Sequence, residues 1–192
     1  MKKTTALLSE YRDLFETCIP NREAKGIFIW LKGRRWQVPI YEEVTDLVGV
    51  PWYMVAIIHT LEAGCRFDRH LHNGDPLTHR TTHVPSGRPA VGTPPFTWIE
   101  SAADALRLKR WDQVSDWSVE HCLYLMESYN GWGYRGRGVN TPYLWAMSNH
   151  YEKGKFVADG KFNPGAVSKQ TGGAVLLKIL VDLGTGIGAG VT

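Results

Sequence analysis

The sequence predicts a mainly α fold of the α+β type: a helical bundle around a central buried helix, with a small irregular β-hairpin or loop region beside a cleft. Residues 51–63 form an apolar run that is too long for an ordinary strand, and helical spacing recurs on both sides of it. Residues 65–95 are instead rich in proline, glycine and threonine and show no helical period. We expect one domain over residues 1–183 and a frayed glycine-rich tail over residues 184–192.

The first third of the chain is predicted to be helical. Apolar residues at i, i+3 and i+4 spacing make residues 4–17 an amphipathic helix. Asn21 can cap a second helix that ends near Lys32, before Gly33. A third, short helix is expected over residues 41–48.

The central helix is expected to run from Pro51 to about Ala63. Proline is tolerated at a first helical position, and Gly64 can end the helix in a left-handed cap. The side chains from Val55 to Leu61 are almost all apolar, which predicts a helix buried on most of its surface. Glu62 would therefore emerge from a core helix.

The second half of the chain alternates helices and turns. A short strand is expected over residues 81–84, within the irregular region. Thr97 is a helix cap, and Glu100 completes a capping box with it. Further helices are predicted over residues 98–109, 118–129, 142–151 and 166–183, with a turn-rich stretch over residues 152–164.

Composition limits the class of protein. With 192 residues, 43% apolar and 21% charged, the chain is typical of a globular domain and not of a disordered one. A net charge of +3 is too small and dispersed to indicate a nucleic-acid partner. Eight tryptophans and eight tyrosines favour a ligand with flat apolar faces, such as a carbohydrate.

The cysteines and the apolar segments bear on the compartment. Cys18, Cys65 and Cys122 are odd in number and widely spaced, which predicts free, buried thiols. The basic start is followed by charged residues and not by a signal-peptide core, and the late apolar run at residues 174–183 is too short to span a bilayer. We expect a protein made in the cytoplasm without a signal peptide and without stable membrane insertion.

Two carboxyl groups are candidate catalytic residues. Glu62, delivered by an apolar helix to the edge of a cleft, would be partly desolvated, which raises the pKa of a carboxyl group and suits a general acid. Asp75 follows thirteen residues later in a loop with Asn73 and Gly74, where a solvated carboxylate would stay ionised. One neutral and one charged carboxyl group is the arrangement that glycoside hydrolysis requires. The plain alternative is that Glu62 is only a polar helix end.

A glycine- and aromatic-rich segment over residues 129–138, YNGWGYRGRG, is a candidate sugar-binding surface. Glycines let the backbone approach a ligand closely, and tyrosine and tryptophan offer flat faces and hydrogen-bonding groups. The alternative is a surface turn that packs only on itself.

Three segments together resemble the lysozyme superfamily, in its branch of goose-type lysozymes and lytic transglycosylases found among phage endolysins. The run IIHTLEAG, residues 57–64, resembles the helix that ends in the catalytic glutamate of that superfamily. Residues 73–75, NGD, resemble a loop that carries a second carboxylate. Residues 129–131, YNG, with PYLW at residues 142–145, resemble the segment that lines the sugar site. The Gly-Leu-Met-Gln segment of this branch is missing; THRTTHVP stands at residues 78–85 instead.

The resemblance implies a muramidase that cleaves the β-1,4 bond between N-acetylmuramic acid and N-acetylglucosamine in peptidoglycan. We expect a monomer that needs no cofactor. Glu62 would protonate the bridging oxygen, and Asp75 would orient water or stabilise the sugar cation. If Asp75 lies outside the cleft, Glu62 alone favours a transglycosylase reaction. We expect the glycan to contact His72, Asn73, Thr81, Thr82, Tyr129, Asn130, Trp132, Tyr134 and Tyr143.

Two other classes of function stay open. His70 and His72, with Asp68 or Asp75, His79 and His83, are dense enough for a zinc site in an amidase or peptidase, although no His-Glu-x-x-His motif is present. A wall-binding module without turnover would also use an aromatic surface, because a fold does not determine a function.

Overall fold

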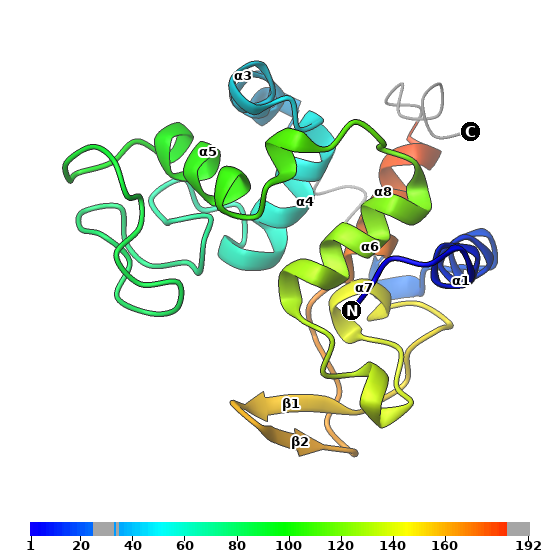
Figure 1. Ribbon diagram of the computed structural model, residues 1–192. Coiled ribbons are helices and arrows are strands. Elements are labelled where there is room, and N and C mark those ends of the chain that lie inside the picture. Colours follow the sequence, from blue (N-terminus) through cyan, green and yellow to red (C-terminus); the bar gives the residue numbers. More distant parts are fainter. Residues whose placement is uncertain (25–32, 34, 184–192) are drawn as a thin grey trace. The chain divides into compact units, whose positions relative to one another are not determined.

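A computed structural model of the chain describes residues 1–24, 33 and 35–183 (Figure 1). The described part is mostly helical and carries one two-stranded antiparallel sheet, which confirms the mainly α class. The chain forms two compact units. The Glu62 unit comprises residues 34–115, and the terminal unit comprises residues 1–33 and 116–192.

The Glu62 unit is built on three helices. They are α3 (Val38–Val48), α4 (Trp52–Ala63) and α5 (Trp98–Leu108), with 3-10 turns η1 (Arg35–Gln37) and η2 (Trp111–Gln113). Helix α3 packs against both α4 and α5. Helix α5 begins with the predicted capping box, in which the Thr97 hydroxyl accepts from the Glu100 N–H and the Glu100 carboxylate accepts from the Thr97 N–H.

Helix α4 has nearly the predicted bounds. Eight of its twelve residues are buried, in keeping with an almost continuous apolar sequence. Pro51 was expected at the first helical position. It instead occupies the N-cap, with an extended ψ of 137°, and the helix begins at Trp52. Gly64 ends the helix in the left-handed conformation, with φ of 57°.

The region between α4 and α5 is an irregular loop, and the strand predicted over residues 81–84 is wrong. The backbone N–H groups of Thr82 and His83 donate to the carboxylate of Asp75, at 2.8 and 3.0 Å, so they are not available to a neighbouring strand. A side-chain acceptor has replaced the strand partner. The only pairing here within the described residues is an isolated bridge between Arg69 and Pro76.

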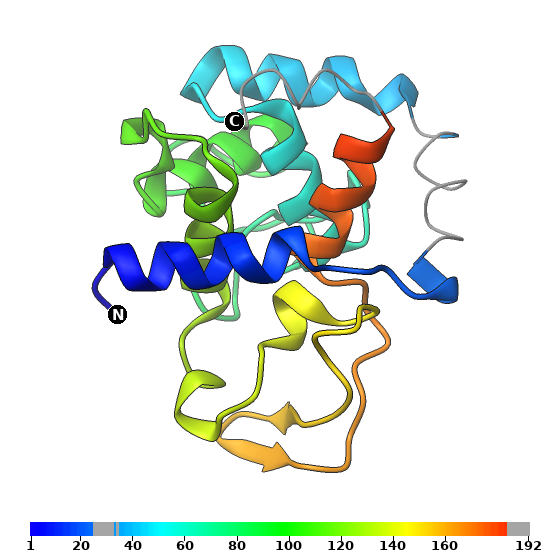
Figure 2. The ribbon, with the colours of Figure 1, turned by 90° about the vertical axis from the view of Figure 1, so that its right-hand side faces the viewer.

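The terminal unit joins the first helix to the last ones (Figure 2). It contains α1 (Thr5–Glu16), α6 (Val119–Asn130), the 3-10 turn η3 (Arg135–Arg137), α7 (Pro142–Trp145) and α8 (Gly173–Asp182). Helix α6 contacts α1, α7 and α8 and forms the centre of this unit. Its buried side chains include Leu123 and Met126.

The sheet lies in the terminal unit, at a position where the sequence predicted only turns. Strands β1 (Lys155–Ala158) and β2 (Lys161–Asn163) pair antiparallel, with Phe156 opposite Phe162. The β-hairpin expected within residues 65–95 is thus misplaced. The observed hairpin is stabilised by the cross-strand pair Phe156 and Phe162, whose ring centroids are 5.3 Å apart.

Two predicted helices are too long. Helix α7 stops at Trp145, and Met147 adopts a positive φ of 68°, so residues 146–151 cannot continue it. Helix α8 starts only at Gly173. A side chain at Gly172 would place its Cβ 2.1 Å from the Leu144 carbonyl oxygen, so this close backbone approach requires glycine.

The three cysteines, Cys18, Cys65 and Cys122, are free and buried, as predicted.

The predicted second helix is described only at its start. The Asn21 side chain accepts from the Ala24 N–H, as expected of a cap, whereas most of this helix and the glycine-rich tail lie outside the described residues. Within the described part no single helix is long and apolar enough to cross a membrane; only α3 and α4 taken together reach the required length, and they meet at 112°.

Candidate functional site

Glu62 occupies the last turn of α4 and is half-buried. The loop that carries Asp75 lies against this end of the helix. A Cβ added to Gly74 would stand 3.2 Å from the Glu62 carbonyl oxygen, and Gly74 has a positive φ of 79°. Both facts favour glycine at this position. The structure therefore brings the predicted Asn-Gly-Asp loop to the end of the helix that carries Glu62.

A positive charge stands near Glu62. Burial lowers the pKa of Lys109, which follows α5, while Coulombic attraction to Glu62 raises it. A nearby cation favours the ionised state of a carboxyl group.

Asp75 is buried, with 7% of its surface exposed, so the expectation of a solvated carboxylate is wrong. One oxygen accepts from the N–H groups of Thr82 and His83 and, more weakly, from the Asn73 amide; the other pairs with His83 Nδ1 at 2.7 Å. Burial alone would raise the pKa of Asp75. The hydrogen bonds from His83 and Thr82 outweigh it and hold the pKa well below its usual value. Asp75 is therefore ionised, but its carboxylate oxygens accept hydrogen bonds from residues of its own loop.

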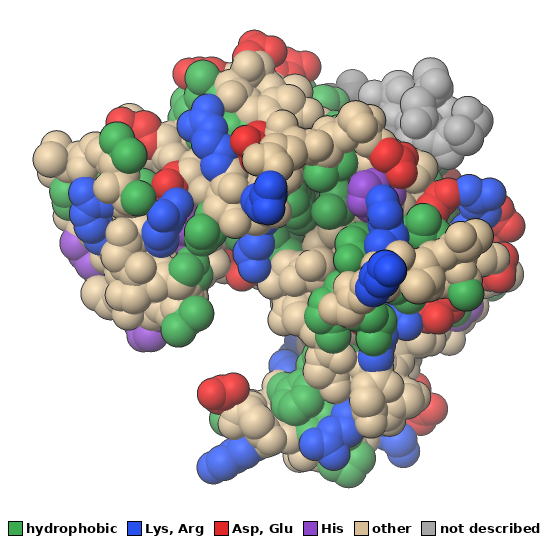
Figure 3. All heavy atoms as spheres, in the orientation of Figure 1, with side chains coloured by type: hydrophobic (Ala, Val, Ile, Leu, Met, Phe, Trp, Pro, Cys, Tyr) green, Lys and Arg blue, Asp and Glu red, His purple; other side chains and the backbone are tan. Residues whose placement is uncertain are grey.

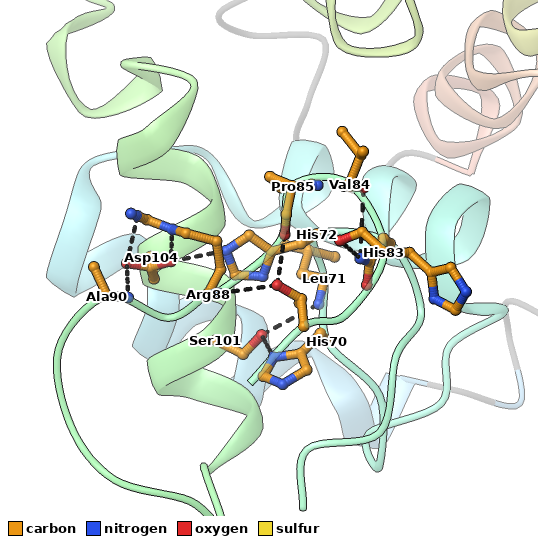
Figure 4. Close-up of polar contacts among 12 residues, drawn as sticks. His70, Leu71, His72, His83, Val84, Pro85, Arg88, Ala90, Ser101 and Asp104 are labelled. Atoms are coloured by element: carbon orange, nitrogen blue, oxygen red, sulfur yellow. Dashed lines mark hydrogen bonds and ion pairs between the residues drawn. The ribbon is translucent and has the colours of Figure 1, made fainter. Parts of the chain in front are cut away.

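A buried polar network fixes the loop to α5 (Figure 4). His72 Nε2 bonds Asp104 Oδ2 at 2.8 Å, and Arg88 donates to both oxygens of Asp104, at 2.9 and 2.7 Å. Only 1% of the His72 side chain is exposed. Burial lowers the pKa of His72, and the bond to Asp104 opposes the shift only in part. His72 is enclosed and does not face solvent, contrary to the expected sugar contact.

The other predicted loop residues also bond mostly within the loop. Thr81 is buried, donates to the Pro85 carbonyl and accepts from the Arg88 N–H, so its hydroxyl is not placed to hold a catalytic water. Asn73 bridges the loop by donating to the His83 carbonyl at 3.0 Å. Thr82 is exposed, and the one contact of its hydroxyl with a described residue is a long one of 3.4 Å to Asp75.

The histidines do not assemble into a metal site. His70 bonds Ser101 Oγ and the His79 carbonyl, both at 2.8 Å, whereas His72 bonds Asp104 and His83 bonds Asp75. Among the residues that the structure describes, no group of three His, Cys, Asp or Glu side chains could hold a metal ion. The described residues therefore give no support to the alternative of a zinc-dependent amidase or peptidase.

The predicted sugar-binding residues of the terminal unit divide into two sets. Asn130 and Tyr134 line one open pocket with residues of the β1–β2 hairpin. Tyr129, Trp132 and Tyr143 are half-buried and do not line it. The ring of Trp132 packs on Tyr124 at 5.3 Å.

A second buried charge network in the terminal unit was not predicted. Glu127 is 2% exposed; its oxygens accept from both Nε and Nη2 of Arg135, at 3.0 and 2.9 Å, and from the Tyr11 hydroxyl at 2.5 Å. Burial raises the pKa of Tyr11, and Glu127 raises it further. Glu10 pairs with the remaining nitrogen of Arg135. Nothing in the spacing of these residues signalled the cluster, because Tyr11 and Glu127 lie 116 positions apart.

Comparisons with protein-family models, with curated proteins and with solved structures found no match to this chain.

Proposed function

We propose that the protein is a peptidoglycan-degrading glycosidase that cleaves the β-1,4 bond after N-acetylmuramic acid, with Glu62 as the general acid. The observation that carries the proposal is the placement of Glu62: half-buried, on the last turn of a rigid apolar helix, with a glycine loop packed on its backbone carbonyl. Partial burial favours the neutral form of a carboxylic acid, whereas a neighbouring cation such as Lys109 favours the ionised form. The resemblance of residues 57–64 to a catalytic helix points to the same residue.

The contacts of Asp75 favour the transglycosylase form of this reaction. An inverting hydrolase needs a second carboxylate with an oxygen open to water. Both oxygens of Asp75 already accept hydrogen bonds from the loop, which argues for a positioning role. Glu62 would then give its proton to the leaving oxygen as the C1–O bond breaks. The Glu62 carboxylate would next accept the proton of the muramic 6-hydroxyl as that oxygen bonds to C1.

The first experiment compares Glu62→Gln with Glu43→Gln, an exposed glutamate on α3 in the same unit. Purified wild-type protein and Glu43→Gln should clear a suspension of permeabilised bacteria. Glu62→Gln should bind the walls and clear them at least about 100-fold more slowly, because loss of a general acid costs about 10²–10⁴ in rate. Normal clearing by a folded Glu62→Gln protein would refute the role of Glu62. A wild-type protein that sediments with walls without clearing them would indicate a binding module.

Mass spectrometry of the digested walls separates the two reaction types. A transglycosylase leaves 1,6-anhydromuramic ends, whereas hydrolysis by water leaves reducing ends. Digestion in H₂¹⁸O adds a second readout, because only hydrolysis incorporates the label into the new end. Labelled reducing ends would return Asp75 to consideration as the group that activates water.

A further inference from the structure

The two most exposed large hydrophobic side chains among the described residues lie in one loop. Val84 is 89% exposed and Val91 is 84% exposed, whereas Ile19, the next in order, is 66% exposed. Both valines belong to residues 76–96 of the Glu62 unit, which we call the valine loop. Scattered exposed apolar residues are normal on protein surfaces, but two such valines in one loop form a candidate contact surface.

Val84 lies within a closed turn over residues 81–88. The Thr81 N–H donates to the Arg88 carbonyl, and the Gly87 N–H donates to the Thr81 carbonyl, both at 2.8 Å. The Thr81 hydroxyl accepts from the Arg88 N–H at 2.9 Å. The polar groups of Thr81 thus close the turn from inside, and the valine side chain is left in solvent.

Val91 lies in a second segment of the valine loop, which Arg80 holds in place. The Arg80 Nη2 donates to the carbonyl of Gly92 at 2.7 Å, and the guanidinium lies over the Phe96 ring at 5.4 Å. The Phe96 side chain is itself buried. A loop braced in this way can present its apolar side chains with little loss of conformational entropy on binding.

The shape of this surface favours a soft partner. A side chain that is more than four-fifths exposed protrudes from the surface and does not line a groove. A protein partner would need a matching pocket for each valine, whereas a fluid lipid bilayer can enclose separate protrusions without preformed pockets. Peripheral binding to a bilayer increases with the apolar area that is buried and with the attraction of basic residues to anionic lipids.

The charge of the valine loop fits an anionic surface. Its ionisable side chains are His79, Arg80, His83 and Arg88, and residues 76–99 contain no aspartate or glutamate. Arg88 is paired with Asp104 of α5, whereas Arg80 donates to a neutral carbonyl group, which leaves its charge unbalanced by that bond. Figure 3 shows hydrophobic, basic and histidine side chains beside one another on this part of the unit. A negatively charged membrane surface attracts such a segment.

We propose that the valine loop docks the protein on the surface of an anionic lipid bilayer. Val84 and Val91 would enter the boundary between headgroups and acyl chains, and the charge of Arg80 would attract the lipid phosphates. The contact is peripheral and involves no membrane-spanning segment. The proposal does not depend on the role of Glu62, because it concerns binding without turnover.

Sedimentation of the full chain with lipid vesicles tests the proposal. Wild-type protein should bind vesicles made of equal parts of phosphatidylcholine and phosphatidylglycerol, and should bind pure phosphatidylcholine about fivefold more weakly. Val84→Asp and Val91→Asp should each weaken binding about tenfold, because the apolar contact is lost, and the double variant should not bind. Val167→Asp changes an exposed valine of the terminal unit and is the matched control, which should bind as the wild type does. Circular dichroism verifies that each variant is folded.

A fluorescent label reports whether the loop enters the bilayer. A polarity-sensitive dye on Val84→Cys should shift its emission to shorter wavelength when the mixed vesicles are added, whereas the same dye on Val167→Cys should not. The three native cysteines are buried, which favours labelling at the introduced one.

The proposal is overturned if the wild type does not sediment with the mixed vesicles, or if the double valine variant binds them as the wild type does. It is also overturned if the double variant loses binding to lipid-free cell walls while the wild type ignores vesicles, because the valine loop would then contact the wall. Vesicles contain no peptidoglycan, so failure of the glycosidase proposal would leave the vesicle result unchanged.

Discussion

Replacing Asp75 with alanine should destabilise the Glu62 unit by about 2–4 kcal/mol. The carboxylate accepts two backbone N–H groups at 2.8 and 3.0 Å, and hydrogen bonds to charged groups contribute about 1.5–3 kcal/mol each. We reduce the sum because Thr82 and His83 are exposed, so water can replace part of the loss. The pair with the His83 ring contributes little, since that side chain is 81% exposed.

The assay is urea unfolding followed by circular dichroism, together with hydrogen exchange of the loop amides. The amides of Thr82 and His83 should lose protection first, because Asp75→Ala removes their acceptor. Asp46→Ala, an exposed aspartate on α3, should change the unfolding free energy by less than about 0.5 kcal/mol. An Asp75→Ala protein as stable as that control, with unchanged exchange at Thr82, would refute the view of Asp75 as the loop's anchor.

Two further predictions address the buried charges. Arg135→Met should cost about 3–5 kcal/mol in unfolding free energy, because it leaves the buried carboxylate of Glu127 without a cation. For His72, burial lowers the pKa in the folded state below the unfolded value of 6.5, so the unfolded chain binds more protons and stability falls as the pH drops below about 6.5. His72→Gln retains a donor for Asp104 but does not titrate, so the loss of stability between pH 7 and 5 should shrink by up to about 1.4 kcal/mol per pH unit.

The Arg135→Met and His72→Gln variants each have a matched comparison. Arg137 lies over the Phe162 ring at 5.3 Å and is exposed, so Arg137→Met should cost less than about 1 kcal/mol. Equal losses for Arg137→Met and Arg135→Met would contradict the buried-pair argument. For His72, urea unfolding of wild type and His72→Gln at both pH values gives the comparison; parallel pH profiles would show that another group controls the acid sensitivity.

The helices were predictable where their signals are local. Thr97 and Glu100 stand three residues apart and satisfy each other's backbone, and Gly64 supplies the left-handed cap that ends α4. Such signals need no knowledge of the rest of the fold. The strand at residues 81–84 failed because the competing acceptor, Asp75, lies seven positions away in sequence. The hairpin at residues 155–163 was missed because its pairing depends on two phenylalanines that a turn-rich composition conceals.

The candidate site shows the same division between local and distant information. The order of Glu62 and the Asn-Gly-Asp loop could be read along the chain, and Gly74 does lie against the Glu62 carbonyl. The residues that bond the loop could not be predicted from the sequence. Asp104 comes from α5, and its bonds to His72 and Arg88 depend on how α5 packs. The same holds for the open pocket beside the β1–β2 hairpin, which Asn130 and Asp159 both line although they are far apart in the sequence.

The contacts of the loop also give a physical reason for its sequence that does not require direct chemistry. Asn73 and Asp75 hold the loop closed, and Gly74 allows it to pass close to the helix that carries Glu62. The loop packs on the backbone carbonyl of Glu62, and the Glu62 residue is half-buried, which is a degree of desolvation that suits the proposed general acid. If Glu62 is the general acid that we propose, Asp75 would support it through the backbone that Asp75 anchors. The Asn-Gly-Asp sequence would then be a folding requirement of the loop, and 1,6-anhydro ends without the ¹⁸O label would agree with this role of Asp75.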